Sequence, residues 1–586
     1  MITSYDYLNI GFYFAFIIGV GVYFSRKSKD TSDYFRGGGV MPWWVTGASA
    51  WMAGFSAWSF TGASGKIYEN GPYVLVLYFQ SVIPLLVLLA FTCYRFRRLR
   101  VVTPMEAVRL RFGACTQQFY TWLRLPVLLV FSALTMNAVG VFMSAVFGFD
   151  ITTVIIGLGV VVTFISLFGG ALGVAASDFV QMLLIVAVVL VIVVLTLMHP
   201  AIGGIEGLIR QAPSKHFNWG EIAQPNFIGF WFLGLTLNTI FKFNSLSDSV
   251  ASKYMMAQSD RHARLMVSIP LIGTIVGSWM LWIIPPMAAA ILHPNLAVEF
   301  PQLRFPNEAA FLATACDVLP QGMLGLLICG IFAASLTDMS GNLNWGAGLI
   351  MRNFYLPVVN PACPEAKLMR LSRLSAMGLG LLLILFALAL SRYRTLGLFD
   401  LVNQVGISLE LPLSIPLCIG MFYKRTPGWS AWSTAFVGLA ASYLARFWLK
   451  PGMVSWIPGI RGPLNAEETN LFYIFATVAV VTAVCVGWFF FTTRFYEKTS
   501  DTFKAGVEEF FQRLRTPVTQ AASGIEENRN FSGGIGRLCL IYGGFVVLLT
   551  AIPNSFNGRL CFLAAGGFIL GIGLLLVWRH RRQISH

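Results

Sequence analysis

Four carboxylates lie within, or at the ends of, membrane-length apolar segments of this 586-residue chain. They are Asp178, Asp248, Asp338 and Glu410. An ionised group in the hydrocarbon region costs several kcal/mol unless it pairs, faces water or binds an ion, so each is a candidate functional group. Asp178 and Asp248 fall near the predicted ends of their segments, where a solvated interfacial position is the alternative interpretation.

Asp338 lies well inside its segment, and other oxygen-bearing side chains surround it. One predicted helix face offers Thr337, Asp338, Ser340, Gly341 and Asn344. Hydroxyl, carboxylate and amide oxygens are the ligands of a hard cation such as sodium. The pattern therefore predicts a cation site, and a buried carboxylate that takes up a proton is the alternative.

The segment 43–65, WWVTGASAWMAGFSAWSFTGASG, has membrane length but carries its own interruption. It places small or hydroxyl residues where a lipid-facing helix would use Leu, namely Gly47, Ser49, Gly54, Ser56, Ser59 and Gly62. Within a bilayer, a backbone carbonyl goes unpaired only where it faces a protein-lined cavity or an ion. The interruption indicates a binding site, and close helix packing through small residues is the alternative.

The composition indicates an all-α polytopic membrane protein, with 56% hydrophobic residues, 11% charged residues and a mean hydropathy of +0.70. About fifteen stretches approach the ~20 residues that a helix needs to cross a bilayer. Basic residues cluster on alternate loops, which places the N-terminus outside and the C-terminus inside. We therefore attribute the net charge of +15 to membrane topology rather than to a nucleic-acid partner, and expect a multi-pass protein of the plasma membrane.

Motifs for catalysis are missing from the sequence. The nine cysteines and six histidines show no metal-ligand or redox spacing, and there is no phosphate-binding loop. The N-terminus lacks the features of a signal peptide, so the first segment is expected to remain as a helix. We expect a protein that is not an enzyme, has no cofactor and does not hydrolyse ATP.

Several motifs carry a resemblance in a fixed order along the chain. They are DYF at 33–35, FTGASG at 60–65, SDFVQ at 177–181 and GMFYKRT at 420–426. Together they resemble the sodium:solute symporter family, which includes the sodium/glucose and sodium/proline transporters. The resemblance covers roughly residues 30–430.

This resemblance implies a LeuT-like core of two inverted five-helix repeats, in which discontinuous helices hold substrate and sodium at the bilayer midplane. The core would span 31–450, with repeats at about 43–200 and 227–425, after a peripheral helix in 1–30. Further helices would fill 451–586. Within them, the polar stretch at about 495–536 is expected to form an amphipathic cytoplasmic helix or a partner-binding linker.

The resemblance also implies a sodium site, made by the backbone carbonyls of Met52 and Phe55 with Ala334, Thr337 and Asp338. The family pattern has a hydroxyl where this chain has Asp338. A register shifted to Met339 and Ser340 would restore the hydroxyl but break the spacing to Asn344. Two further residues match a second cation site of some relatives, or a proton site: Ser56 and Asp178.

Substrate contacts carried over from the family fall near Gly54, Ser59, Asn137, Phe243, Asn244 and Asn403, with Gln404 and Glu410 as neighbours. Amide and acid groups favour a neutral polyhydroxy substrate, so we expect a sugar or polyol. Lys242 keeps a carboxylate or an amino acid open, because its ammonium group could pair with a substrate carboxylate. Ser252 and Lys253 stand where relatives often carry Gln-Arg, which indicates a changed inner gate or simple drift.

Together these features predict a sodium-coupled symporter that imports a small polar solute across the lipid bilayer. A proton-coupled symporter and a sensor that kept the transporter fold remain the alternatives.

Overall fold

The computed structural model describes residues 2–25, 41–52, 54, 56–168, 171–247, 249–277, 282–393, 395–450, 463–519 and 522–584. The named elements in these ranges are helices, and β-pairing among them is limited to one isolated bridge between Met41 and Ala257. The all-α prediction is confirmed.

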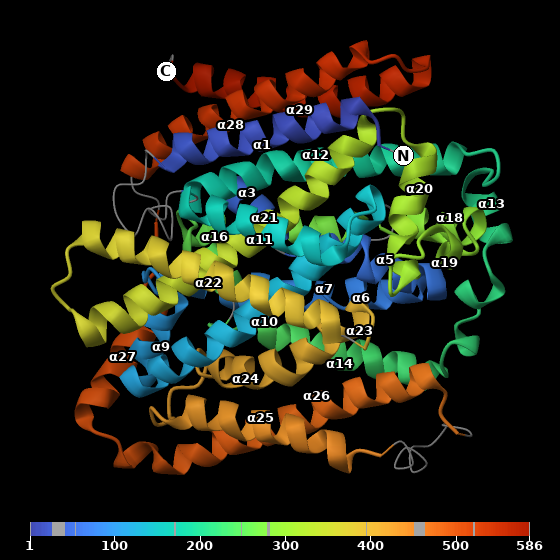
Figure 1. Ribbon diagram of the computed structural model, residues 1–586. Helices are drawn as coiled ribbons and strands as arrows, with labels where there is room; N and C mark the ends of the chain where they lie inside the picture. The colour runs from blue at the N-terminus through green and yellow to red at the C-terminus, as the bar shows by residue number, and fades with distance from the viewer. Residues whose placement is uncertain are drawn as a thin grey trace.

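Long helices form the body of the molecule (Figure 1). They are α1 (Ser4–Ser25), α10 (Ala114–Phe147), α11 (Ile151–Phe168), α12 (Ala171–Met198), α14 (Pro225–Phe243), α21 (Met323–Ile350), α22 (Glu365–Tyr393), α25 (Ser430–Trp448), α26 (Ala466–Phe491), α28 (Ala522–Leu548) and α29 (Phe556–Ile584).

Shorter elements lie between them. Those used below are α3 (Trp43–Met52), α4 (Ala57–Phe60), α5 (Gly62–Asn70), α7 (Val82–Val87), η3 (Leu88–Thr92), α8 (Cys93–Arg98), α9 (Pro104–Phe112), α15 (Ser249–Met255), α16 (Asp260–Ile272), α18 (Ile284–Leu292), α20 (Ala310–Val318), α23 (Leu398–Val405), η9 (Gly406–Glu410), α24 (Leu411–Ile419) and α27 (Asp501–Arg515).

Within the described ranges, nine helical stretches are long and apolar enough to cross a membrane. A multi-pass membrane protein is confirmed, whereas the total of about fifteen spans and the orientation of the termini stay predictions. Some predicted spans are divided into short helices. In 43–65, α3 ends at Met52 and α4 begins at Ala57, and in 227–249, α14 ends at Phe243 and α15 begins at Ser249.

The centre of the molecule is built around α21, most of whose residues are buried. It packs against α1, α10, α12 and α22. The paired helices α28 and α29 lie on the flank next to α1 and α12, while α25 and α26 lie on the opposite flank (Figure 1). A helix buried on all sides presents its polar groups to other helices instead of lipid, so α21 is suited to hold a polar site.

The predicted polar stretch at about 495–536 contains α27. Ser500 is the N-cap of this helix. Its residues Val507, Phe510 and Leu514 are buried, and α27 packs against α8 and α9. Arg98 of α8 donates to the carbonyl of Leu514 at 2.9 Å. The apolar face of this amphipathic helix is therefore covered by protein. The proposed domain boundaries themselves stay a prediction.

The first helix is attached to the central helix through a buried acid. Asp6 is 1% exposed; its Oδ1 accepts a hydrogen bond from the backbone amide of Gly325 at 2.6 Å. Its Oδ2 accepts from the amide and the hydroxyl of Thr3 at 2.8 and 2.7 Å. These bonds hold the start of α1 against the start of α21.

Replacing this acid tests the attachment. We expect Asp6→Ala to lower the free energy of unfolding by about 1–3 kcal/mol, because the amide of Gly325 loses its acceptor in a buried position. Thermal unfolding of the purified protein in detergent measures the loss. Asp501→Ala, at an exposed acid of α27, is the control and should change stability by less than about 0.5 kcal/mol. Equal effects of both substitutions would contradict the assignment.

Candidate functional site

The interruption between α3 and α4 is built from residues that satisfy its exposed backbone groups. Ser56 is the N-cap of α4 and accepts from the amide of Trp58 at 3.3 Å. The amide of Ala57 donates to Oγ of Ser335, on α21, at 2.8 Å. Ser335 is fully buried, so it supplies an acceptor that water cannot provide there. The interruption is thereby fixed to the middle of α21.

The predicted sodium ligands lie on both sides of this contact. Met52 ends α3 and is buried, and Ala334 is the buried neighbour of Ser335. Thr337 donates to Oε1 of Gln181 on α12 at 3.2 Å, so it faces α12. Phe55 lies outside the described residues.

Asp338 faces a different helix from Thr337. Its Oδ2 accepts from the Thr135 hydroxyl of α10 at 3.3 Å, and its Oδ1 accepts from the Asn342 amide at 3.4 Å. Thr135 and Asn342 are neutral donors, so these two bonds by themselves do not compensate the charge of the carboxylate. At the end of α3, the amide of Gly54 donates to the Trp51 carbonyl at 2.9 Å.

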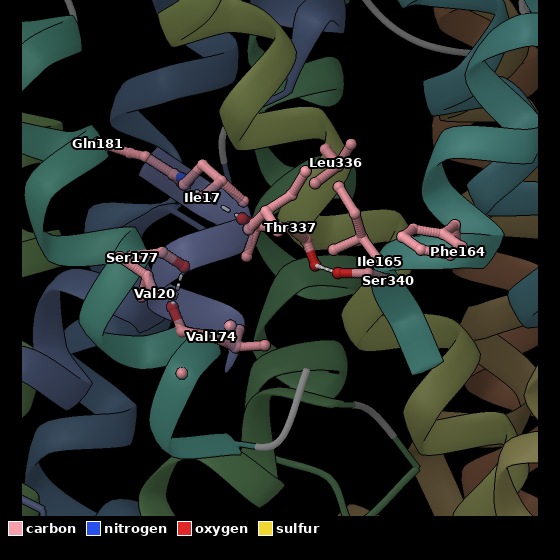
Figure 2. A pocket seen from close by; sticks show the side chains of 13 residues that line it. Ile17, Val20, Phe164, Ile165, Val174, Ser177, Gln181, Leu336, Thr337 and Ser340 are labelled. Atoms are coloured by element: carbon pink, nitrogen blue, oxygen red, sulfur yellow. Dashed lines mark hydrogen bonds between the residues drawn. The ribbon is translucent and has the colours of Figure 1, made fainter. Parts of the chain in front are cut away.

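Thr337 also lines a cavity of about 130 Å³ between α1, α11, α12 and α21 (Figure 2). Its polar wall consists of Ser177, Gln181, Thr337 and Ser340, and the rest is apolar. Ser177 donates to the carbonyl of Val174 at 2.8 Å, and Ser340 donates to that of Thr337 at 3.3 Å. The hydroxyl oxygens keep acceptor capacity after donating, so the wall can bind a cation or water.

Asp178 lies next to this wall and is buried, with 1% of its surface exposed. The alternative interpretation, a solvated carboxylate, is therefore wrong. The Ser49 hydroxyl of α3 donates to its Oδ2, and Nζ of Lys253, on α15, lies 4.0 Å from the same oxygen. Lys253 also donates to Oγ of Ser49 at 2.8 Å. In the described ranges no hydrogen bond joins Asp178 to Ser56, the other predicted member of a second cation site.

Two predicted substrate amides make contacts within the protein. Asn137 donates to the carbonyls of Ala133 and Ala387 at 2.9 and 3.0 Å, which joins α10 to α22. Asn244, just after α14, donates to the carbonyl of Ile240 at 2.9 Å and accepts from the Thr92 hydroxyl. These two amides face different neighbours, and among the described residues no hydrogen bond joins them.

The remaining predicted substrate residues lie on the broken helices and on α23. Gly54 is exposed in the α3–α4 interruption, and Ser59 is buried in α4. Phe243, at the end of α14, is half-buried. On α23, Asn403 donates to the Phe399 carbonyl at 3.1 Å, and Gln404 beside it is half-buried.

Glu410 is the acidic member of a buried charge cluster. It ends the π-helical turn η9, and its carboxylate lies 2.6 Å from Nζ of Lys242 and 3.5 Å from Nη2 of Arg124. Nζ of Lys242 also stands 5.2 Å from the ring centroid of Phe131. The cluster thus joins α10, α14 and η9, and its lysine directly precedes the predicted substrate contact Phe243 in the chain. A lysine at this position can bind an anionic group of a ligand.

Comparison with known proteins identifies the family of this chain. The family model for the sodium:solute symporter family matches residues 34–438. The chain belongs to this family. The match includes both interrupted helices, α21 and η9, and it ends within α25.

Relatives of this symporter are known from bacteria and mammals. The sodium/sialic acid symporter of Aliivibrio fischeri is 24% identical over 82% of this chain and 92% of its own. The human sodium/myo-inositol cotransporter 2 is 23% identical over 81% and 75%. The sodium/glucose cotransporter of Vibrio parahaemolyticus is 22% identical over 76% and 85%.

A solved structure shares the fold of this symporter. It is the substrate-bound outward-open state of a Na⁺-coupled sialic acid symporter, with a TM-score of 0.64 and 19% identity, over 83% of this chain and 98% of that one. This symporter is therefore a multi-pass transporter of the plasma membrane with that helical fold.

Some residues of the site were not singled out from the sequence. Ser335 adjoins a predicted ligand, and Gln181 belongs to the SDFVQ motif, so both carried a usable signal. Arg124 is a basic residue inside an apolar segment, and its charge could have been matched to Glu410. Thr135 had no distinguishing signal, because a threonine in an apolar helix most often bonds its own backbone.

The bond between Ser335 and Ala57 gives a testable prediction for this symporter. Ser335→Ala should lower the free energy of unfolding by about 1–3 kcal/mol and weaken the stabilisation by sodium, because the first amide of α4 loses its acceptor. Thermal unfolding with and without sodium measures both effects. Ser372→Ala is the matched control, since within the described ranges this buried hydroxyl bonds only the Leu368 carbonyl of its own helix. An unchanged response to sodium in Ser335→Ala would contradict the coupling.

Proposed function

We propose that this symporter couples the inward movement of sodium to the uptake of a sugar or polyol. Sodium bound at the α3–α4 interruption stabilises the outward-open conformation, and that conformation binds the solute more tightly. Coupling of this kind is a mutual dependence of two affinities, typically about 1–3 kcal/mol. The membrane potential contributes about 2.3 kcal/mol per charge per 100 mV to the driving force.

The observation that carries the proposal is the bond between the amide of Ala57 and Oγ of Ser335. It fixes the interruption against the stretch of α21 that holds the oxygen-bearing residues. The proposed ligands are the carbonyls of Met52, Phe55 and Ala334, the Thr337 hydroxyl and the Asp338 carboxylate. Inverted repeats of the LeuT type explain why α3–α4 and α14–α15 are both broken, since each begins one repeat.

Asp338 distinguishes this proposed site from one made of neutral oxygens. A carboxylate adds a full negative charge to the ligand set, which tightens binding of a cation. The same carboxylate could instead carry a proton, so proton coupling is the alternative that an experiment must separate.

The first experiment compares sodium with potassium at constant ionic strength and at two pH values. We expect sodium to raise the thermal stability of the wild type, by about 2.7 kcal/mol at one hundred times its dissociation constant. Asp338→Asn should abolish this rise. Asp150→Asn, at an exposed acid before α11, is the control and should keep it. Proton coupling would be indicated if the thermal stability of the wild type did not respond to sodium but depended on pH, and if Asp338→Asn removed that pH dependence.

For the solute, the proposed contacts are Gly54, Ser59, Phe243, Asn403 and Gln404, with Asn137 and Asn244 supporting the surrounding helices. An aromatic ring and several amides suit a polyhydroxy ring, which offers an apolar face and hydroxyl groups. The relatives named for glucose and myo-inositol agree with this class.

A sugar that carries a carboxylate is the second candidate, and a specific observation favours it. The side chain of Lys242, the residue before Phe243, is 31% exposed, whereas the side chain of its partner Glu410 is 6% exposed. Lys242 is thus the more exposed residue of the pair. A relative named for sialic acid is consistent with an acidic sugar.

Lys242→Gln separates the two candidates. If the solute is an acidic sugar, uptake of that sugar should lose at least about tenfold in apparent affinity, which corresponds to 1.4 kcal/mol. If it is a neutral sugar or polyol, its apparent affinity should change by less than about threefold. Sodium-driven uptake into proteoliposomes gives both values. The response of thermal stability to sodium is the internal control, because Lys242 is not among the proposed sodium ligands.

A further inference from the structure

Lys253 lies next to Asp178, the buried carboxylate of the predicted second cation site. The contacts of its ammonium group join three elements, because it bonds Ser49 of α3 and lies 4.0 Å from Asp178 of α12, while Lys253 itself belongs to α15. The lysine side chain is 18% exposed and the Asp178 side chain 1%. This is a buried ion pair, bridged by a hydroxyl that bonds both charged groups.

A buried carboxylate in a membrane helix needs a positive partner, because an uncompensated charge costs several kcal/mol. At Asp178 the protein supplies that partner from its own chain. One carboxylate oxygen, Oδ1 of Asp178, has no hydrogen-bond partner in the part of the chain that the structure describes. It is therefore an available ligand for a small cation once the ammonium group leaves.

Other oxygen-bearing side chains lie near this position. Ser49 donates to the carboxylate and keeps lone pairs, whereas Ser177, the neighbour of Asp178 in the chain, lines the cavity between α1, α11, α12 and α21. One turn further on, Gln181 accepts from Thr337. Carboxylate, hydroxyl and amide oxygens of this kind form a ligand set for sodium, as they do at Asp338.

We infer that Lys253 acts as a tethered cation that takes the place of a second sodium ion at Asp178. In this conformation the symporter then binds one sodium ion, at the Asp338 site, and the charge at Asp178 is neutralised from within. The inference rests on the proposed function for the Asp338 site. Lys253 is a positioning residue, because it changes the number of bound sodium ions through its contact with Asp178 and does not itself bind sodium.

The arrangement also has a conformational consequence. Ser49 lies in the first half of the broken helix α3–α4, and Lys253 lies in the second half of the broken helix α14–α15. The ion pair holds these two halves together against α12. A sodium ion at Asp178 would bind Asp178 and Ser49 but would not hold α15, so the lysine adds a connection that an ion cannot provide.

The test counts bound sodium with radiolabelled sodium on the full-length purified protein, which needs no knowledge of the solute. We expect one ion per wild-type protein and two per Lys253→Met protein, because methionine has a similar length without the charge. Lys253→Arg should stay at one. Adding Asp178→Asn to Lys253→Met should return the count to one, a change that a merely structural role of Lys253 would not produce.

The outcomes separate the inference from the proposed function. Two ions bound to the wild type, or one ion bound to a folded Lys253→Met protein, overturn the inference and leave the Asp338 site standing. No sodium bound to the wild type overturns the proposed function itself. If Lys253→Met does not fold, Lys253→Gln replaces it, and the wild-type count alone still decides whether Asp178 holds a second ion.

Discussion

Every backbone amide and carbonyl in the hydrocarbon region must find a partner within the protein, and the rest of this structure depends on that constraint. The interruption between α3 and α4 meets it in two ways. Ser56 caps the first turn of α4, and Ser335 of α21 accepts from the amide of Ala57. The amide of Gly54, inside the interruption, also donates to the Trp51 carbonyl of α3 at 2.9 Å.

The same cost governs the buried charges. Asp178 is compensated by Lys253 and Glu410 by Lys242 and Arg124, and in both clusters the lysine belongs to the broken helix α14–α15. Buried ion pairs contribute little net stability, because desolvation offsets their attraction. Their presence at the two interrupted helices is explained better by function. In this conformation the two pairs join α14–α15 to α12, to α10 and to η9.

The family match ends at residue 438, and the chain continues with helices that cover the core from two sides. On one flank, α29 packs against α12, the helix that carries Asp178. At one end of the bundle, α27 lies against α8 and α9, where Arg98 pairs with Asp260 at 2.7 Å and bonds the carbonyl of Leu514. These contacts connect the extension to α16, the helix that follows α15. The extension thus packs against α12 on one flank, and at α27 it is connected to α8, α9 and α16.

The sequence by itself determined the all-helical membrane class and the interruption within 43–65, and it singled out Asp178, Asp338 and Glu410 as candidates, because hydropathy and the cost of a buried charge are local properties. It placed Asn137 and Asn244 near the substrate, but the fold uses both amides to join helices. Only the tertiary structure decided that Asp178 is buried against Lys253. It also decided that Ser335 accepts a hydrogen bond from the amide of Ala57, which lies 278 positions earlier in the chain. Helical periodicity indicates which residues share a face, but the partner that meets that face depends on long-range packing of the helices.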